Sequence, residues 1–318
     1  MRIRLAMTVG DPRGIGPEIV AKALADPEVN ERCDIVAIGP EGTDVAISES
    51  IGKWTPDSDT EFAGRLSGLA IERAVAMARA GSVDGIVTAP IDKFALHAGG
   101  YDFPGHTEML ASLTQSRVAM MLASDKLRVV LATTHIPLRR VIDELDANKI
   151  VDVARITREG LEQWFGVQSP RIALCAVNPH AGDGGRFGSE DTELLEPAAQ
   201  KAGISGPFSA DTVFVRAMRG EFDAVIAPYH DIGMTAIKVA SFGSAVNITL
   251  GLPFPRTSPD HGTALDIAGQ DLADPSSMIA ATLLCASIAS RGHRSVDRPS
   301  YGDRPPESRS GGRPSRAR

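Results

Sequence analysis

Short apolar runs recur along the chain, and most are bounded by glycine, proline or charged residues. Such runs are typical of buried strands in a parallel sheet. They predict strands at residues 3–9, 34–38, 84–90, 118–122, 127–133, 171–177, 224–227 and 245–250. Amphipathic stretches predict helices at residues 19–24, 62–80, 147–165 and 276–290, while residues 39–59 are polar and predict a loop. The alternation of the two kinds of element indicates an α/β fold.

Three of the predicted strands finish with a histidine close to a proline. These histidines are His135, His180 and His230. Ligands of open α/β sheets bind beyond the carboxyl ends of the strands, and three imidazoles can hold a divalent metal with one open position. The alternative is that each histidine is an ordinary hydrogen-bonded loop residue. The chain has no compact motif such as His-Glu-x-x-His, so the spacing leaves both interpretations open.

Two glycine-rich segments lie between predicted strands and helices. The first contains Gly10, Asp11 and Gly14, and its pattern is not the Gly-x-Gly-x-x-Gly fingerprint of dinucleotide-binding folds. Its glycines either allow backbone amides to approach a ligand or simply form a tight turn. The second precedes His106 and Thr107, where the threonine either caps a helix or helps to hold an anion.

Other polar residues have two possible roles each. Asp211 lies where a helix begins, as a cap or as a residue of a site. Lys238 and Arg256 would, taken alone, be surface charges, and Asn247 lies within a predicted strand. The proline- and glycine-rich loop predicted at residues 251–264 lies inside the folded region and is therefore no simple linker.

Composition narrows the class of protein. The chain has 318 residues, 43% of them hydrophobic and 23% charged, which suits one large or two moderate domains. A net charge of -7 argues against a nucleic-acid-binding protein, and no apolar run is long enough to span a bilayer. Three distant cysteines and the lack of a signal peptide predict a cytoplasmic protein. Residues 291–318 lose nearly all apolar content and predict a disordered tail.

Several strings, taken in order, resemble the 4-hydroxythreonine-4-phosphate dehydrogenase family of pyridoxal phosphate biosynthesis. They are Gly-Asp-Pro-x-Gly-Ile-Gly-Pro-Glu, Gly-His-Thr-Glu, Thr-Thr-His-Ile-Pro-Leu, Asn-Pro-His-Ala-Gly, Ala-Asp-Thr-Val-Phe, Tyr-His-Asp and Arg-Thr-Ser-Pro-Asp-His-Gly-Thr-Ala. The resemblance extends from about residue 5 to residue 289. It departs from the family at Ile232, where the family usually has glutamine.

The resemblance implies two α/β/α domains like those of isocitrate and isopropylmalate dehydrogenases, with the active site in the cleft between them. The first domain would comprise residues 1–115 and 240–290, and the second residues 116–239. It also implies a homodimer whose subunits share the active site.

The resemblance further implies roles for individual residues. The metal ligands would be His135, His180 and His230, and Asp211 or Lys238 would assist proton transfer. The substrate would contact His106, Thr107, Lys238, Asn247 and Arg256, and the cofactor would contact Gly10, Asp11, Gly14, Asp260 and His261.

The implied reaction is the metal- and NAD-dependent oxidation of 4-phosphooxy-L-threonine to a β-keto acid, which decarboxylates to 3-amino-2-oxopropyl phosphate. NADP is a possible replacement for NAD, and zinc, magnesium and cobalt are the candidate metals. One alternative is a related dehydrogenase of D-threonate or D-erythronate 4-phosphate. Oxidation of aromatic cis-dihydrodiols fits less well, because the intact positions Lys238, Asn247 and Arg256 suit a phosphorylated substrate. A catalytically inactive metal- or nucleotide-binding protein also fits less well, because every matched position is filled.

Overall fold

The computed structural model describes residues 2–241 and 244–296, which fold around one mixed sheet. In the described residues the strand order is β3-β2-β1-β4-β11-β10-β5-β6-β9-β7-β8. The strands are β1 Ile3–Thr8, β2 Cys33–Glu41, β3 Glu49–Lys53, β4 Gly85–Thr88, β5 Ala119–Ala123, β6 Arg128–Leu131, β7 Ile172–Cys175, β8 Ser205–Phe208, β9 Ala224–Ala227, β10 Val246–Leu250 and β11 Arg256–Ser258.

Helices cover both faces of this sheet. They are α1 Gly16–Ala25, α2 Pro27–Arg32, α3 Thr60–Arg79, α4 Lys93–Ala98, α5 His106–Thr114, α6 Val141–Glu144, α7 Ala147–Phe165, α8 Glu196–Ala202, α9 Ala210–Met218, α10 His230–Ser241 and α11 Ser276–Val296. Three short helical turns are η1 Leu138–Arg140, η2 Pro179–Gly185 and η3 Asp191–Leu195. No helix among the described residues is both long and apolar enough to cross a membrane.

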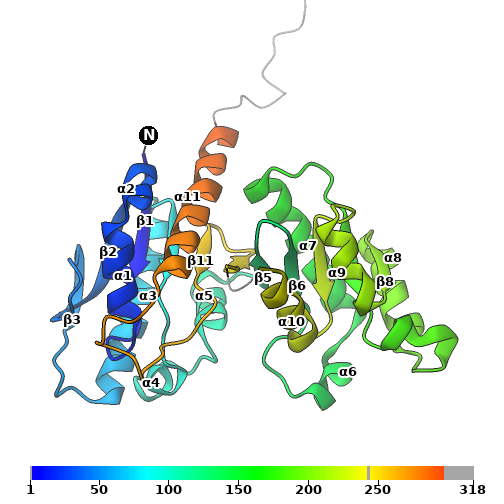
Figure 1. The fold of residues 1–318 in the computed structure, drawn as a ribbon, viewed down its shortest axis with the longest axis horizontal. Coiled ribbons are helices and arrows are strands. Elements are labelled where there is room, and N and C mark those ends of the chain that lie inside the picture. The colour runs from blue at the N-terminus through cyan, green and yellow to red at the C-terminus, as the bar shows by residue number, and fades with distance from the viewer. Residues whose placement is uncertain (1, 242–243, 297–318) are drawn as a thin grey trace, which may run out of the picture.

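Two parallel blocks of strands meet at the middle of the sheet. β3, β2, β1, β4 and β11 are mutually parallel, as are β6, β9, β7 and β8. Between the blocks, β10 is antiparallel to β11 and to β5, and β5 is antiparallel to β6. Figure 1 shows the result as two lobes on either side of these central strands.

The hydrophobic core differs between the two faces of the sheet. On one face a single cluster of buried side chains runs through both lobes and includes residues of α1, α7, α8 and α11. On the other face the described residues form two separate large clusters, one under α3, α4 and α5 and the other under α9 and α10. A small further cluster of Trp54, Ala63 and Leu66 lies at the start of α3. The central strands therefore have a continuous apolar layer behind them and a break between two clusters in front.

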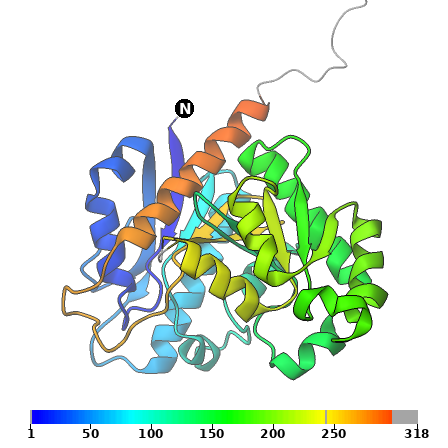
Figure 2. The ribbon, with the colours of Figure 1, turned by 45° about the vertical axis from the view of Figure 1, so that its right-hand side comes forward.

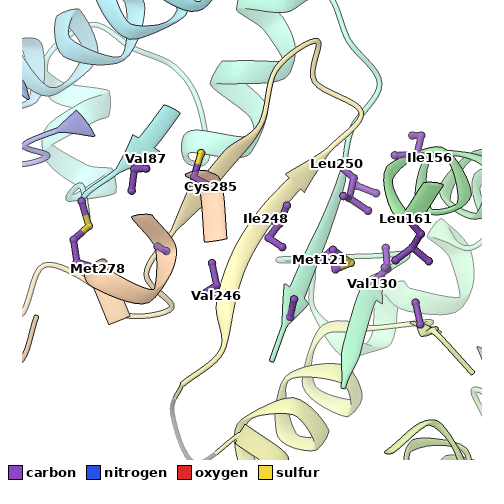
Figure 3. Packing of buried hydrophobic residues seen from close by; sticks show 14 of the residues in the cluster. Val87, Met121, Val130, Ile156, Leu161, Val246, Ile248, Leu250, Met278 and Cys285 are labelled. Atoms are coloured by element: carbon purple, nitrogen blue, oxygen red, sulfur yellow. The ribbon is translucent and has the colours of Figure 1, made fainter. Parts of the chain in front are cut away.

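The sequence of β10 matches this difference. Val246, Ile248 and Leu250 alternate with Asn247 and Thr249, so the apolar side chains lie on one face and the polar ones on the other. Figure 3 shows the three apolar residues packed toward α7 and α11. The polar pair faces the break between the two front clusters, which is where the candidate site lies.

The predicted α/β fold is confirmed, and the observed elements differ from the predicted ones in a few places. β3 forms within the predicted loop at residues 39–59, and β11 forms within the one at residues 251–264. β8 was not predicted either. α11 continues to Val296, so residues 291–296 belong to a helix and not to the predicted tail. Residues 297–318 lie outside the described part of the chain.

Candidate active site

A cavity of about 480 Å³ occupies the break between the two front clusters. It is lined from one lobe by the ends of β4 and β11 and the start of α5, and from the other by the segment after β6 and by α10. All five residues predicted to bind substrate line it, namely His106, Thr107, Lys238, Asn247 and Arg256. Segments far apart in the sequence thus converge on one site.

Arg256 is the most unusual residue of the cavity, because its side chain is buried without a carboxylate partner. It is 2% exposed, and its Nη1 and Nη2 donate hydrogen bonds to the hydroxyls of Thr249 (3.0 Å) and Thr88 (2.6 Å). Its buried Nε has no hydrogen-bond partner. Burial lowers the pKa of this guanidinium to about 10. Because a buried charge is costly unless it is paired, the arrangement favours an anionic ligand.

The start of α5 adds further groups that can bind an anion. The helix begins at His106 after Gly105, and no side chain caps its first amides. Burial lowers the pKa of His106 well below its usual value, and the charges of Arg256 and Lys93 lower it further. The buried Nε2 of His106 has no hydrogen-bond partner. Because the N-cap residue is Gly105, Thr107 does not cap this helix. The first backbone amides of α5 have no side-chain partner, and the residues that carry them line the cavity.

Two of the three predicted metal ligands lie together. The ring centroids of His135 and His230 are 5.3 Å apart, and both residues line the cavity. The Nδ1 of His230 lies 2.8 Å from Asp231 Oδ1, which orients the ring. Burial, with the charges of Lys93 and His230, lowers the pKa of His135, which keeps this imidazole neutral as a ligand must be.

The third predicted ligand lies elsewhere in the same chain. His180 is in η2, outside the cavity lining, with its side chain 67% exposed. Its Nδ1 is 3.9 Å from Asp211, and its ring is 6.4 Å from that of Phe187. Among the described residues no three histidine, cysteine or acidic side chains are placed to hold a metal ion. One chain alone therefore does not bring the three imidazoles together.

The two candidates for proton transfer are also separated. Lys238 lines the cavity and forms an ion pair with Asp260 at 3.4 Å. Asp211 stands beside His180, where it accepts a hydrogen bond from the Ser209 hydroxyl. The residue at the N-cap of α9 is Ser209, so Asp211 is not the helix cap.

The predicted cofactor residues fall into two groups. Asp260 and His261 line the cavity, and burial raises the pKa of Asp260 although Lys238 opposes this effect. Gly10 and Gly14 are needed by the chain itself, because a Cβ at Gly10 would lie 2.2 Å from Pro90 O and one at Gly14 2.8 Å from Thr263 O. The tight-turn interpretation is thus correct for these glycines, and it does not exclude a cofactor beside them.

The carboxylate of Asp11 is held within the protein. It is fully buried and accepts hydrogen bonds from the Arg13 backbone amide and guanidinium at 2.7–3.0 Å. Arg13 and Gly14 line a second cavity of about 720 Å³. Asp11 thus fixes the loop through Arg13 rather than pointing freely at a ligand.

Sequence reasoning missed two charged residues of the cavity, Lys93 and Glu108. Lys93 follows the strand-ending Ala89-Pro90 pair, and Glu108 is part of the Gly-His-Thr-Glu string. Both positions could have been found from the rule that ligands bind beyond strand ends and at helix starts. The departure at Ile232 is a packing feature, since this side chain is partly buried against the cluster under α9 and α10.

Comparison with known proteins identifies the family. Residues 16–285 match the family model described as pyridoxal phosphate biosynthetic protein PdxA. This chain belongs to the PdxA family. The resemblance noted in the sequence is therefore confirmed.

Relatives within the PdxA family cover nearly the whole chain. The 4-hydroxythreonine-4-phosphate dehydrogenase of Desulfosudis oleivorans is 42% identical over 316 residues, which cover 87% of this chain and 93% of that protein. The D-threonate 4-phosphate dehydrogenase of Cupriavidus necator is 40% identical, covering 90% and 97% of the two chains. The crystal structure of the Klebsiella pneumoniae 4-hydroxythreonine-4-phosphate dehydrogenase is similar with a TM-score of 0.81 at 38% identity, covering 91% and 98%.

The predicted likeness in fold to β-decarboxylating dehydrogenases is also confirmed. Such an enzyme from Thermococcus kodakarensis matches 93% of this chain with a TM-score of 0.54. At 15% identity, this match concerns the fold alone.

Proposed function

We propose that this chain is an NAD-dependent dehydrogenase that oxidises 4-phosphooxy-L-threonine to a β-keto acid, which decarboxylates to 3-amino-2-oxopropyl phosphate. The observation that carries the proposal is Arg256, a buried guanidinium that faces the cavity with hydroxyl partners alone. An anionic substrate would supply the missing counter-charge. The names of the relatives at about 40% identity support this substrate class.

The substrate would be held by groups from both lobes. Arg256 and the start of α5, with His106 and Thr107, offer positive charge and free amides. Asn247 offers an amide whose Oδ1 is buried without a hydrogen-bond partner. Unpaired buried polar atoms are costly, so these groups become satisfied when a polar ligand enters the cavity.

A divalent metal fits the residues present. His135 and His230 offer two close imidazoles, one kept neutral by burial and the other oriented by Asp231. Neutral imidazoles suit zinc and cobalt better than magnesium, which prefers oxygen ligands. A bound metal would supply Lewis acidity that lowers the pKa of the substrate hydroxyl.

The third imidazole would come from a second copy of the chain. His180 is exposed and lies outside its own cavity, although its motif matches that of a ligand. A homodimer in which His180 and the neighbouring Asp211 reach the partner's cavity would complete the site. Exposed apolar side chains between His135 and α7, Leu138 at 68% and Ile142 at 40%, would suit such a contact.

The dinucleotide would bind along the loop between the two cavities. Asp260 and His261 line the first cavity, Gly14 lines the second, and Gly14 packs on Thr263. The Asp11–Arg13 pair would keep this loop rigid. NAD would accept the hydride; NADP is an alternative that would require a cation for its additional phosphate.

Proton transfer would be divided between two residues. Asp211, a carboxylate, would take the hydroxyl proton when it enters the site with His180. Lys238 carries a proton in its ion pair with Asp260 and would donate it to the carbon that loses carbon dioxide. Cavity walls from both lobes would exclude water during these steps.

The test is an assay of NAD reduction by purified protein with three substrates, 4-phosphooxy-L-threonine, D-threonate 4-phosphate and D-erythronate 4-phosphate. We expect the first to give the highest kcat/KM, and we expect a metal chelator to abolish turnover until zinc or cobalt is restored. A higher kcat/KM for either sugar-acid phosphate would assign the chain to the alternative function. The named Cupriavidus relative is the reason for including this comparison.

A further inference from the structure

Lys93 lines the cavity but has no role in the proposed function. It is the first residue of α4, its side chain lines the 480 Å³ cavity, and it forms no hydrogen bond or ion pair within the described part of the chain. The other lysine of the cavity, Lys238, is already paired with Asp260. Lys93 thus presents a free ammonium group to whatever enters.

The position of Lys93 is close to the uncapped start of α5. A Cβ at Gly105, the N-cap residue of α5, would lie 3.8 Å from the Cε of Lys93. The lysine charge also reaches His106 and His135: burial is the first cause of their lowered pKa values, and Lys93 contributes to both. The Lys93 side chain therefore lies beside the start of α5 and lines the same cavity as the pair of imidazoles.

Arg256 independently indicates an anion at the same end of the cavity. It is 2% exposed with an unpartnered Nε, and its charge acts on His106 as that of Lys93 does. Glu108 is the opposing charge, since its Oε2 would lie 3.6 Å from a Cβ at Gly105. With Lys238 and Asp260 offsetting one another, two cations face one carboxylate, and the net charge is positive.

We propose that Lys93 is a substrate-binding residue whose ammonium contacts the phosphoryl group of the substrate at the start of α5. The inference rests on the proposed function for the identity of the substrate. A phosphoryl group carries nearly two negative charges near neutral pH, and both a point-charge ammonium and free helix amides suit it. A carboxylate has about half that charge, so the ammonium and the helix amides would stabilise it less at the same position.

The experiment compares Lys93→Met and Lys93→Arg with Lys126→Met, a matched exposed lysine in the turn between β5 and β6. Binding of inorganic phosphate is measured by calorimetry, and KM and kcat are measured for 4-phosphooxy-L-threonine and for 4-hydroxy-L-threonine. We expect Lys93→Met to weaken phosphate binding and to raise KM for the phosphorylated substrate about ten- to a hundredfold. KM for the unphosphorylated substrate should stay within about twofold, because it has no group for Lys93 to hold.

Two further results separate this role from a structural one. Lys93→Arg should retain most of the phosphate affinity, because it keeps the charge. Zinc affinity of Lys93→Met, measured against a chromophoric chelator, should be equal or higher, because a repelling cation has gone. Unchanged phosphate binding in Lys93→Met, or equal losses with both substrates, would overturn the proposal.

The outcome for the wild-type protein distinguishes this inference from the proposed function. If the wild type reduces no NAD with any phosphorylated four-carbon acid, the proposed function fails. Lys93-dependent binding of inorganic phosphate would then still support the phosphate subsite. If the wild type turns over 4-phosphooxy-L-threonine and Lys93→Met does so with an unchanged KM, the function stands and the Lys93 inference fails.

Discussion

At the scale of single residues, the candidate active site is marked by buried polar atoms that have no hydrogen-bond partner within the protein. Arg256, His106 and Asn247 each have a buried polar atom without a hydrogen-bond partner, and all three line the same cavity. Such atoms cost free energy in the folded protein, and others lie elsewhere among the described residues, but three that line one cavity indicate a polar ligand there.

Replacing Arg256 should separate stability from function. In Arg256→Met an apolar side chain of similar length replaces a buried cation that has no carboxylate partner. We expect the free energy of unfolding to stay within about 1 kcal/mol of the wild type or to rise. KM for the phosphorylated substrate should rise at least about tenfold, while the Kd of NAD stays unchanged. A protein destabilised by more than about 2 kcal/mol would show that Arg256 is mainly structural.

His106 should make stability depend on pH. Its folded pKa is depressed, firstly by burial, so below the unfolded value of about 6.5 the unfolded chain binds the proton and the folded chain does not. Stability is therefore lost as the pH falls from about 6.5 toward the folded pKa, by at most about 1.4 kcal/mol per pH unit. We expect urea unfolding of His106→Gln to show a smaller loss between pH 7 and pH 5. The exposed His97→Gln is the control and should behave as the wild type does.

At the scale of elements, α4 positions Lys93 through its packing on α3. A Cβ at Gly64 of α3 would lie 1.7 Å from the backbone oxygen of Ala95 in α4. The two helices can approach this closely only because residue 64 has no side chain.

Gly64→Ala should therefore displace α4 and the lysine at its start. We expect a loss of about 1–3 kcal/mol in the free energy of unfolding, together with a raised KM for the phosphorylated substrate. Glu61→Ala, on the exposed part of the same helix, should change neither quantity. Full stability of Gly64→Ala in denaturant titrations would show that the helices can separate without cost.

Most elements could be predicted from the sequence, and those that could not share a physical reason. β3 is a polar edge strand paired only with β2, and β11 is buried although it consists of Arg256, Thr257 and Ser258. An apolar pattern cannot reveal a strand whose buried side chains are polar. The residues predicted to bind substrate were singled out by their motifs, and all five line one cavity, whereas Lys93 was missed because a lone lysine after a strand has no distinctive pattern. The separation of His180 from His135 could not be read from strand ends alone.

At the scale of the whole molecule, the proposed dimer makes a prediction about mixed subunits. His180→Ala and His230→Ala should each be inactive as pure proteins. If His180 serves the partner's cavity, a heterodimer of the two variants has one intact site and one with both defects. Random assembly of equal amounts should then recover about a quarter of the wild-type activity. No recovery after subunit exchange, with heterodimers demonstrated by mass spectrometry, would place all three ligands in one chain.

The continuous apolar layer behind the sheet has a consequence for how the chain melts. That single cluster joins β1 and α1 of one lobe to β7, β9 and α8 of the other, with β10 and β5 between them. Neither lobe can expose its share of the layer without also uncovering side chains of the other. We therefore expect one calorimetric transition, with equal van't Hoff and calorimetric enthalpies, in place of two stepwise ones. A cavity made in the second lobe, for example by Ile226→Ala in β9, should lower the melting temperature of the lobe that contains β1 and α1 as much as that of the lobe that contains β9.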